Sequence, residues 1–227
     1  MSKHISSFHI WIMDRKERFK FHAPTTIAVF APPYSGKSFL TRQILQHADE
    51  LFKYPPEKVV YCYKEWLEMF DEMKEEMSNL ILHQGLPTAE LMEEWSNGNH
   101  FILVLDDLQQ RVQRDMDAAE LFTVGSHHKN CTLIYLCHNI FGKGVFSRLI
   151  NLNTHYIILF RNNRDVQQVQ TLGRQIFGRN SHYFLDAYEK ATSKDWGYLL
   201  VNVHPKYRKE LLTHILPGED TIVYKPK

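Results

Sequence analysis

The stretch "TIAVFAPPYSGKSFL", residues 26–40, decides the fold. Its first six residues are apolar or β-branched and predict a strand that is covered on both faces. The next seven contain two prolines, two serines and a glycine, and after them Leu40, Ile44 and Ala48 recur at the spacing of one helix face. Strand, loop and helix in this order are the setting of a phosphate-binding loop, whose pattern is G-x-x-x-x-G-K-[ST].

The loop keeps the end of that pattern and departs from its start, where Ala31 replaces the first glycine. Gly36 allows backbone N–H groups to approach phosphates, Lys37 can reach the β and γ oxygens, and Ser38 can offer its hydroxyl to Mg²⁺. Alanine at position 31 costs about 1 kcal/mol only if φ must be positive there. The residues predicted to hold ATP are Pro33, Tyr34, Ser35, Gly36, Lys37, Ser38 and Phe39.

A second motif, "FILVLDD" at residues 101–107, is an apolar strand that ends in two carboxylates. This is the Walker B arrangement, in which one acid holds Mg²⁺ and the other polarises the attacking water. We assign Asp106 to the metal and Asp107 to the water. Adjacent acids are also common at helix N-termini, and the phosphate loop upstream favours the catalytic interpretation.

A third motif, "CTLIYLCHN" at residues 131–139, is a buried strand that ends in two polar residues. In a sheet of this kind the carboxyl ends of the strands face the nucleotide. His138 or Asn139 is therefore predicted to sense the γ-phosphate. The alternative is a helix-capping asparagine beside a surface histidine.

Further apolar runs at 58–63, 155–160 and 196–203 alternate with helix-like stretches, among them 163–177 and one that follows Thr88 as N-cap. Strands that alternate with helices predict an α/β fold with a mostly parallel central sheet flanked by helices, the P-loop NTPase class. No repeat or long linker divides the chain. We predict one domain over residues 1–227 with its core at about 24–203, and leave open whether residues 218–227 form a last strand or a docking tail.

Composition limits the classes of function. Residues 1–139 carry 14 basic and 19 acidic side chains, whereas residues 140–227 carry 13 and 7, so a net charge of −5 is followed by one of +6. A basic C-terminal part is compatible with a polyanionic partner and equally with solvated charge. The three cysteines lack the spacing of a zinc or redox pair. With neither a signal peptide nor a long apolar run, the chain is expected to be a soluble intracellular protein without membrane contact.

Four segments together resemble the viral genome-packaging ATPases of the FtsK-HerA superfamily, the type of poxviruses, adenovirus-like viruses and Polinton-like viruses. They are "VFAPPYSGKS", "FILVLDD", "SHHKNCTLIYLCHNIF" and "THYIILFRNNRDVQQVQTLGRQIF", and the likeness runs from about residue 24 to 178. The chain departs from the family at Ala31, and at His138, where members commonly have glutamine.

The resemblance implies a RecA-like (ASCE) core that acts as a pentameric or hexameric ring on double-stranded DNA, with a capsid or portal protein as a further partner. The protein would then work in the infected host cell, with virion association left open. In such rings an arginine completes the neighbouring subunit's active site. Arg148 and Arg161 are the first candidates for that catalytic role and Arg164 the next. Possible contacts to DNA phosphates are Lys143, Arg174, Arg179 and the "KYRK" segment at 206–209.

Two other classes remain open on the sequence. A P-loop kinase would need an arginine-rich lid and an acceptor pocket, and the paired aspartates and the sensor strand argue against it. A non-hydrolysing nucleotide-dependent assembly protein would bind ADP without turnover that DNA stimulates. A replication motor lies close to the packaging ATPase, and the residues alone do not separate the two.

Overall fold

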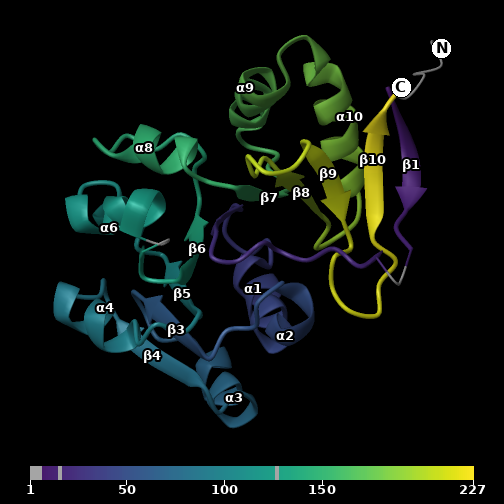
Figure 1. Cartoon of the computed structure of the whole chain (residues 1–227). Coiled ribbons are helices and arrows are strands. Elements are labelled where there is room, and N and C mark those ends of the chain that lie inside the picture. Colours follow the sequence, from purple (N-terminus) through teal and green to yellow (C-terminus); the bar gives the residue numbers. More distant parts are fainter. Residues whose placement is uncertain (1–6, 15–16, 126–127) are drawn as a thin grey trace.

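A ten-stranded sheet runs through the computed structural model, which describes residues 7–14, 17–125 and 128–227 (Figure 1). Six of its strands were predicted, with ends shifted by no more than two residues. The strands are β1 (Phe8–Ile12), β2 (Thr26–Phe30), β3 (Lys58–Tyr63), β4 (Leu80–Gln84), β5 (Phe101–Asp106), β6 (Cys131–Cys137), β7 (Tyr156–Phe160), β8 (Tyr198–Asn202), β9 (Glu210–Thr213) and β10 (Ile222–Pro226).

The strand order is β1-β10-β9-β8-β7-β2-β6-β5-β3-β4. From β7 to β4 every neighbouring pair is parallel, which confirms the predicted α/β class. The other end of the sheet is antiparallel. There β8 pairs antiparallel with β7, β9 with β8, β10 with β9, and β1 with β10. The segment at 218–227, left open on the sequence, therefore contributes a strand of the same sheet.

Short helices fill most of the connections between the strands. They are α1 (Lys37–Gln46), α2 (Ala48–Leu51), α3 (Met69–Glu76), α4 (Ala89–Trp95), α5 (Gln109–Val112), α6 (Met116–Glu120), α8 (Ser147–Leu152), α9 (Val166–Phe177) and α10 (Ser181–Ala191), with a short π-helix η2 (Leu121–Gly125) and a short 3-10 helix η3 (Gly178–Asn180). The predicted cap is present, since the Thr88 hydroxyl accepts from the Leu91 N–H at 3.4 Å. None of these described helices is long and apolar enough to cross a membrane.

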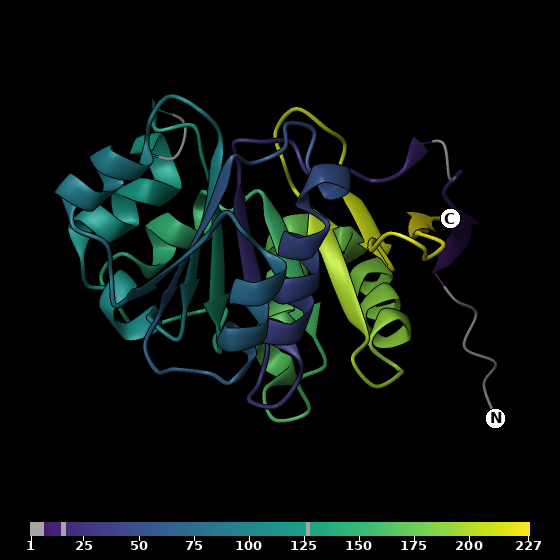
Figure 2. The ribbon, with the colours of Figure 1, turned by 90° about the horizontal axis from the view of Figure 1, so that it is seen from below.

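The helices form two layers, one on each face of the sheet, and Figures 1 and 2 show them in two views. Helices α1, α2 and α3 pack on one face, and α4, α5, α6, α8, α9 and α10 on the other. Alternate residues of β2 serve the two layers: Ile27 and Val29 face the first, and Ala28 and Phe30 the second. All of β2 is buried, as the apolar run predicts.

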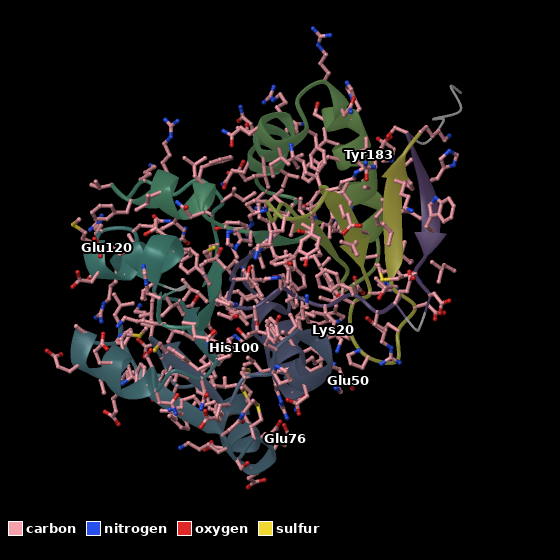
Figure 3. All side chains as sticks on the ribbon, viewed as in Figure 1. Lys20, Glu50, Glu76, His100, Glu120 and Tyr183 are labelled. Carbon is pink, nitrogen blue, oxygen red and sulfur yellow. The ribbon has the colours of Figure 1, made fainter. Side chains whose placement is uncertain are left out.

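Polar contacts hold the helices to their neighbours. Arg42 on α1 binds Glu72 and Glu76 of α3, the latter at 2.8 Å (Glu76 is labelled in Figure 3). Tyr183 of α10 donates its hydroxyl to the backbone oxygen of Tyr224 on β10. The first contacts tie α1 to α3 on one face of the sheet, and the second ties α10 to the antiparallel strand β10 on the other face.

Candidate nucleotide site

The loop between β2 and α1 has the geometry of an anion site. Gly36, the residue before α1, has φ +91°, a conformation that glycine adopts without strain. Within the described part of the chain no side chain caps the N-terminus of α1, and its first turn contains no acid. Helices α4, α6 and α9 are capped by Thr88, Asp115 and Asp165. The free N–H groups of α1 are therefore available to phosphate oxygens.

Ala31 fits this loop without backbone strain. Tyr34 in the loop has a positive φ of +62°, whereas the φ of Ala31 is not positive. The Ala31 N–H donates to the Cys137 oxygen at 3.1 Å and its side chain is buried, so the residue continues the β2–β6 pairing. The first position of the motif thus requires a small side chain here and not the conformational freedom of glycine.

Asp106, the last residue of β5, is surrounded by donors. It is 3% exposed. Its Oδ1 lies 3.0 Å from Lys37 Nζ, and its Oδ2 accepts from Ser38 Oγ at 3.2 Å and from the Tyr61 hydroxyl at 2.8 Å. Three partners satisfy a buried carboxylate that would otherwise be costly to keep ionised. The parallel pairing of β2, β6, β5 and β3 brings these four side chains to one end of the sheet.

Asp107 projects from the turn after β5, with φ +55° and a side chain that is 50% exposed. Its Oδ1 lies 3.1 Å from His138 Nε2 and 3.2 Å from Lys37 Nζ. The hydrogen bond from His138, assisted by Lys37, lowers the pKa of Asp107 far below its ordinary range. The same bond raises the pKa of His138 above 6.5. A carboxylate with such a low pKa is a weak base, and it is better suited to orienting a water molecule than to keeping its proton.

Lys37 is shared between the two acids. Burial alone would lower its pKa, but the charges of Asp106 and Asp107 outweigh this and raise it. The ammonium group is therefore charged at any physiological pH. The side chains of Lys37 and Asp106 are 11% and 4% exposed, so this pair is largely buried, whereas the Asp107 side chain is half exposed.

The residue after β6 that faces the acids is His138. Its Nδ1 lies 3.1 Å from the Ala31 oxygen, which connects it to the start of the loop. Asn139 points elsewhere: its Oδ1 accepts from Gln168 Nε2 at 3.4 Å. Gln109, at the start of α5, links the segment after β5 to the segment after β6. Its Oε1 accepts from the His138 backbone N–H at 3.0 Å, and its Nε2 donates to the Asn139 backbone oxygen at 3.1 Å. Asp107, His138 and Asn139 all line an open pocket of about 1070 Å³.

The predicted arginines lie apart from this cluster. Arg148, on α8, and Arg161, after β7, are both exposed. The Arg161 Nε donates to Asn163 Oδ1 at 3.0 Å within its own loop. Neither arginine has a hydrogen bond to Asp107 or Lys37 among the contacts of the described residues. Lys143 lines the large pocket, whereas Arg174 is on α9, Arg179 in η3, and residues 206–209 lie between β8 and β9.

The cluster fits the cofactors that the motif implies. Ser38 Oγ and the Asp106 carboxylate supply two neighbouring hard oxygen ligands, the type that Mg²⁺ prefers, with water and phosphate oxygens to complete the shell. The described residues contain no group of three or more His, Cys, Asp or Glu side chains that could hold a metal by themselves. The uncapped helix and Lys37 match the charge of a triphosphate.

Sequence reasoning did not identify Tyr61 as part of the site. Tyr61 is fully buried, and its hydroxyl is the only side-chain donor to Asp106 among the described residues that does not come from the phosphate loop. The available signal was a phenol within the buried part of β3, the strand that pairs directly with β5. Trp196, predicted as strand, instead lies in the turn before β8, with φ +63°.

The fold is that of P-loop ATPases. Solved structures that share it include B204, the DNA-packaging ATPase from Sulfolobus Turreted Icosahedral Virus, at 14% identity and TM-score 0.56, with 82% of this chain and 96% of that one covered. The genome packaging NTPase B204 from Sulfolobus turreted icosahedral virus 2, in complex with ATP-gammaS, matches at 13% identity and TM-score 0.57, with 82% and 95% covered. No protein-family model and no curated protein sequence matches the chain.

Proposed function

We propose that this protein is a Mg²⁺-dependent ATPase that moves double-stranded DNA and packages a viral genome. The observation that carries the proposal is the cluster of Lys37, Ser38, Asp106 and Asp107 at the end of the phosphate loop. The packaging role rests on the motifs that resemble the FtsK-HerA enzymes and on a fold shared with packaging ATPases over 82% of the chain.

The residues divide the chemistry of ATP hydrolysis among them. The N–H groups at the start of α1 and the Lys37 ammonium bind the phosphates and stabilise the charge that develops on them. Asp107 orients a water molecule whose oxygen attacks the γ-phosphorus as the bond from that phosphorus to the β,γ-bridging oxygen breaks. ADP leaves with the electron pair, and the water proton is released to solvent through Asp107. Ser38 and Asp106 would hold Mg²⁺, which would supply positive charge to neutralise the triphosphate.

Phosphate binding must change the cluster. Lys37 contacts both acids at 3.0 and 3.2 Å, and it cannot keep this geometry while it reaches the β and γ oxygens. Asp107 then retains His138 as its cation, at 3.1 Å. In this proposal ATP and the two acids therefore compete for Lys37.

The exposed basic side chains support a ring on DNA. Arg148 and Arg161 are available to a neighbouring subunit, and Lys143 lines the open pocket that contains Asp107. A neighbour's arginine that enters this pocket would reach the γ-phosphoryl from the solvent side. DNA held through its phosphates would be gripped without regard to sequence, as packaging requires. The protein would act in infected cells.

The test measures steady-state ATP hydrolysis and ATP binding with and without double-stranded DNA. Lys37→Ala is expected to lose both binding and turnover, whereas Asp107→Asn is expected to bind ATP and lose turnover. Lys20→Ala and Asp49→Asn, two exposed side chains away from the site, are the matched controls. If the wild type binds ATP but never hydrolyses it, the assembly-protein alternative replaces the ATPase. If it hydrolyses ATP without response to DNA, the translocase part fails.

Mixing two inactive variants tests the shared site. In a ring, Asp107→Asn still donates its arginine and Arg148→Ala still supplies its acid, so the mixture regains part of the wild-type activity. The same experiment with Arg161→Ala decides between the two arginines. A mixture that stays as inactive as its components for both arginines contradicts an arginine supplied by either residue to a neighbour.

A further inference from the structure

Trp196 lies directly on the phosphate loop. A Cβ atom built on Gly36 would come within 2.5 Å of Trp196 Cε3 and 2.9 Å of Cζ3, so the indole ring covers this glycine at van der Waals distance. The contact joins two segments 160 positions apart in the chain, the phosphate loop and the turn that connects α10 to β8. Only a glycine at position 36 leaves room for the ring.

The conformation of Trp196 is unfavourable for folding. Its φ of +63° is rare for a bulky residue, and 64% of its surface is exposed, so the ring adds little to the core. The turn holds it in place: the Gly197 N–H donates to the Lys194 oxygen at 3.1 Å, and a Cβ at Gly197 would meet the Ala191 oxygen at 2.5 Å. Backbone strain that the surroundings enforce is concentrated at active sites and ligand clamps in proteins.

A pocket of about 350 Å³ opens between Trp196 and the start of α1. Gly36, Phe39 and Gln43 line it from the loop and helix, Trp196 from the turn, and His214 from the segment after β9. Phe39 is 58% exposed and supplies a second aromatic surface. The volume is in the range of small-molecule sites, which are mostly apolar with a few polar groups.

This pocket shares no lining residue with the larger one that contains Asp107 and His138. Gly36 lines the smaller pocket, while the next residue, Lys37, reaches Asp107 in the larger one. A triphosphate on the loop, with its γ-phosphate toward Asp107, therefore has its nucleoside end toward Trp196 and Phe39. Resting on the proposed nucleotide function, we propose that Trp196 and Phe39 form the wall on which the base of the bound nucleotide stacks.

The chemistry of the site predicts affinity with little discrimination among bases. Stacking on an aromatic ring is available to every base, because each has a π face. Removal of one such ring is expected to weaken nucleotide binding about 10- to 100-fold. Binding of inorganic tripolyphosphate, which has the phosphates and lacks the base, is expected to stay within about 2-fold of wild type.

The experiment measures dissociation constants for MgATP, MgGTP and magnesium tripolyphosphate by calorimetry, for the wild type, Trp196→Ala, Trp196→Phe and Lys37→Ala. Trp66→Ala is the matched control, since Trp66 is 46% exposed and packs on Tyr63 and Phe70. The expected result is that Trp196→Ala weakens ATP and GTP to a similar degree, spares tripolyphosphate, and is rescued by Trp196→Phe.

The other outcomes overturn the proposal in distinguishable ways. If Lys37→Ala abolishes tripolyphosphate binding but Trp196→Ala leaves the dissociation constant for ATP unchanged, the proposed base wall is wrong and the phosphate site is retained. If Trp196→Ala changes ATP and tripolyphosphate binding equally in either direction, the ring acts on the loop and not on the base. If the wild type binds none of the three probes, the base wall and the proposed nucleotide function fail together.

Discussion

Tyr61→Phe isolates the support that the sheet gives to the metal-binding acid. The change removes one oxygen atom from a fully buried ring and leaves its packing on Phe70 in place. The lost bond joins a phenol to a carboxylate at 2.8 Å, and the Asp106 side chain has 4% exposure with which to recruit water instead. Hydrogen bonds to charged groups contribute about 1.5–3 kcal/mol. We therefore expect the free energy of unfolding to fall by about 1.5–3 kcal/mol.

The effect should be the same between pH 6 and 9. Burial, followed by the charge of Asp106, raises the pKa of Tyr61 well above 10, so the phenol remains a donor over this range. Thermal unfolding should then show a midpoint lowered by about 3–12 °C at each pH, from a dependence of about 2–4 °C per kcal/mol for a chain of this size. Denaturant titration gives the free energy directly. The Mg²⁺ concentration for half-maximal ATP turnover should also rise, because Asp106 loses a positioning partner.

Tyr156→Phe is the matched control for this prediction. Tyr156 is also buried, at 1% exposure, and its hydroxyl accepts from the backbone N–H of His22 at 3.2 Å, a neutral bond away from the acids. Its loss should cost only about 0.5–1.5 kcal/mol and leave the Mg²⁺ requirement unchanged. If Tyr61→Phe costs no more than Tyr156→Phe, or if the Mg²⁺ requirement is the same in both, the assigned role of Tyr61 is wrong.

Three further predictions concern the loop and the acid pair. Ala31→Gly should leave ATP affinity unchanged in a binding titration. It should lower the free energy of unfolding by about 0.5–1 kcal/mol, because glycine gives the unfolded chain more conformational entropy. Tighter ATP binding by this variant would show that the motif glycine was needed. Gly36→Ala should destabilise the protein through positive φ and through the indole contact, and Trp196→Ala in the same chain should recover only part of the loss in denaturant melts; full recovery would refute backbone strain at Gly36. The difference in unfolding free energy between wild type and His138→Gln should be largest between about pH 4 and 6.5, where the pair is charged in both the folded and unfolded chain. It should shrink as pH rises through the raised pKa of His138 and again as pH falls below about 4, and a flat profile would contradict the pairing with Asp107.

Apolar runs predicted five of the six strands in the parallel half of the sheet and missed β4, which has no fully buried residue. Strands β2, β5 and β6 are buried along their whole length, and the candidate site residues lie at or just after the carboxyl end of each strand. The same sequence segments therefore predict both the strands and the edge of the sheet that carries the site. The antiparallel half was less visible. β1 exposes four of its five residues and β9 has only three buried residues in a row, so both lack the longer buried runs of the six predicted strands. Their place in the sheet depends on pairing with β10, which sequence spacing does not encode.

The sequence likewise predicts some residues of the candidate site and not others. The cluster of Lys37, Asp106 and Asp107 follows from motif and topology, because β2 and β5 are parallel strands on either side of β6 and their carboxyl ends lie at the same edge of the sheet. The partners of that cluster do not follow from the sequence. A tyrosine within a strand is most simply interpreted as a core residue, and only the structure shows that the Tyr61 hydroxyl donates to Asp106. Trp196 was invisible for another reason: "WG" ahead of an apolar run is typical of strand, and only the αL conformation turns the indole away from the sheet and onto the loop.

The departure from the motif at Ala31 separates two demands that the pattern G-x-x-x-x-G combines. The first position lies where β2 still pairs with β6, so its requirement is a side chain small enough to be buried, and a methyl group meets it. The second position begins the helix with φ +91° and carries the Trp196 ring on its surface, so its requirement is both conformational and steric. Substitution is tolerated at the position with one requirement that alanine satisfies. It is excluded at the position where a Cβ would be strained by the backbone and blocked by the indole.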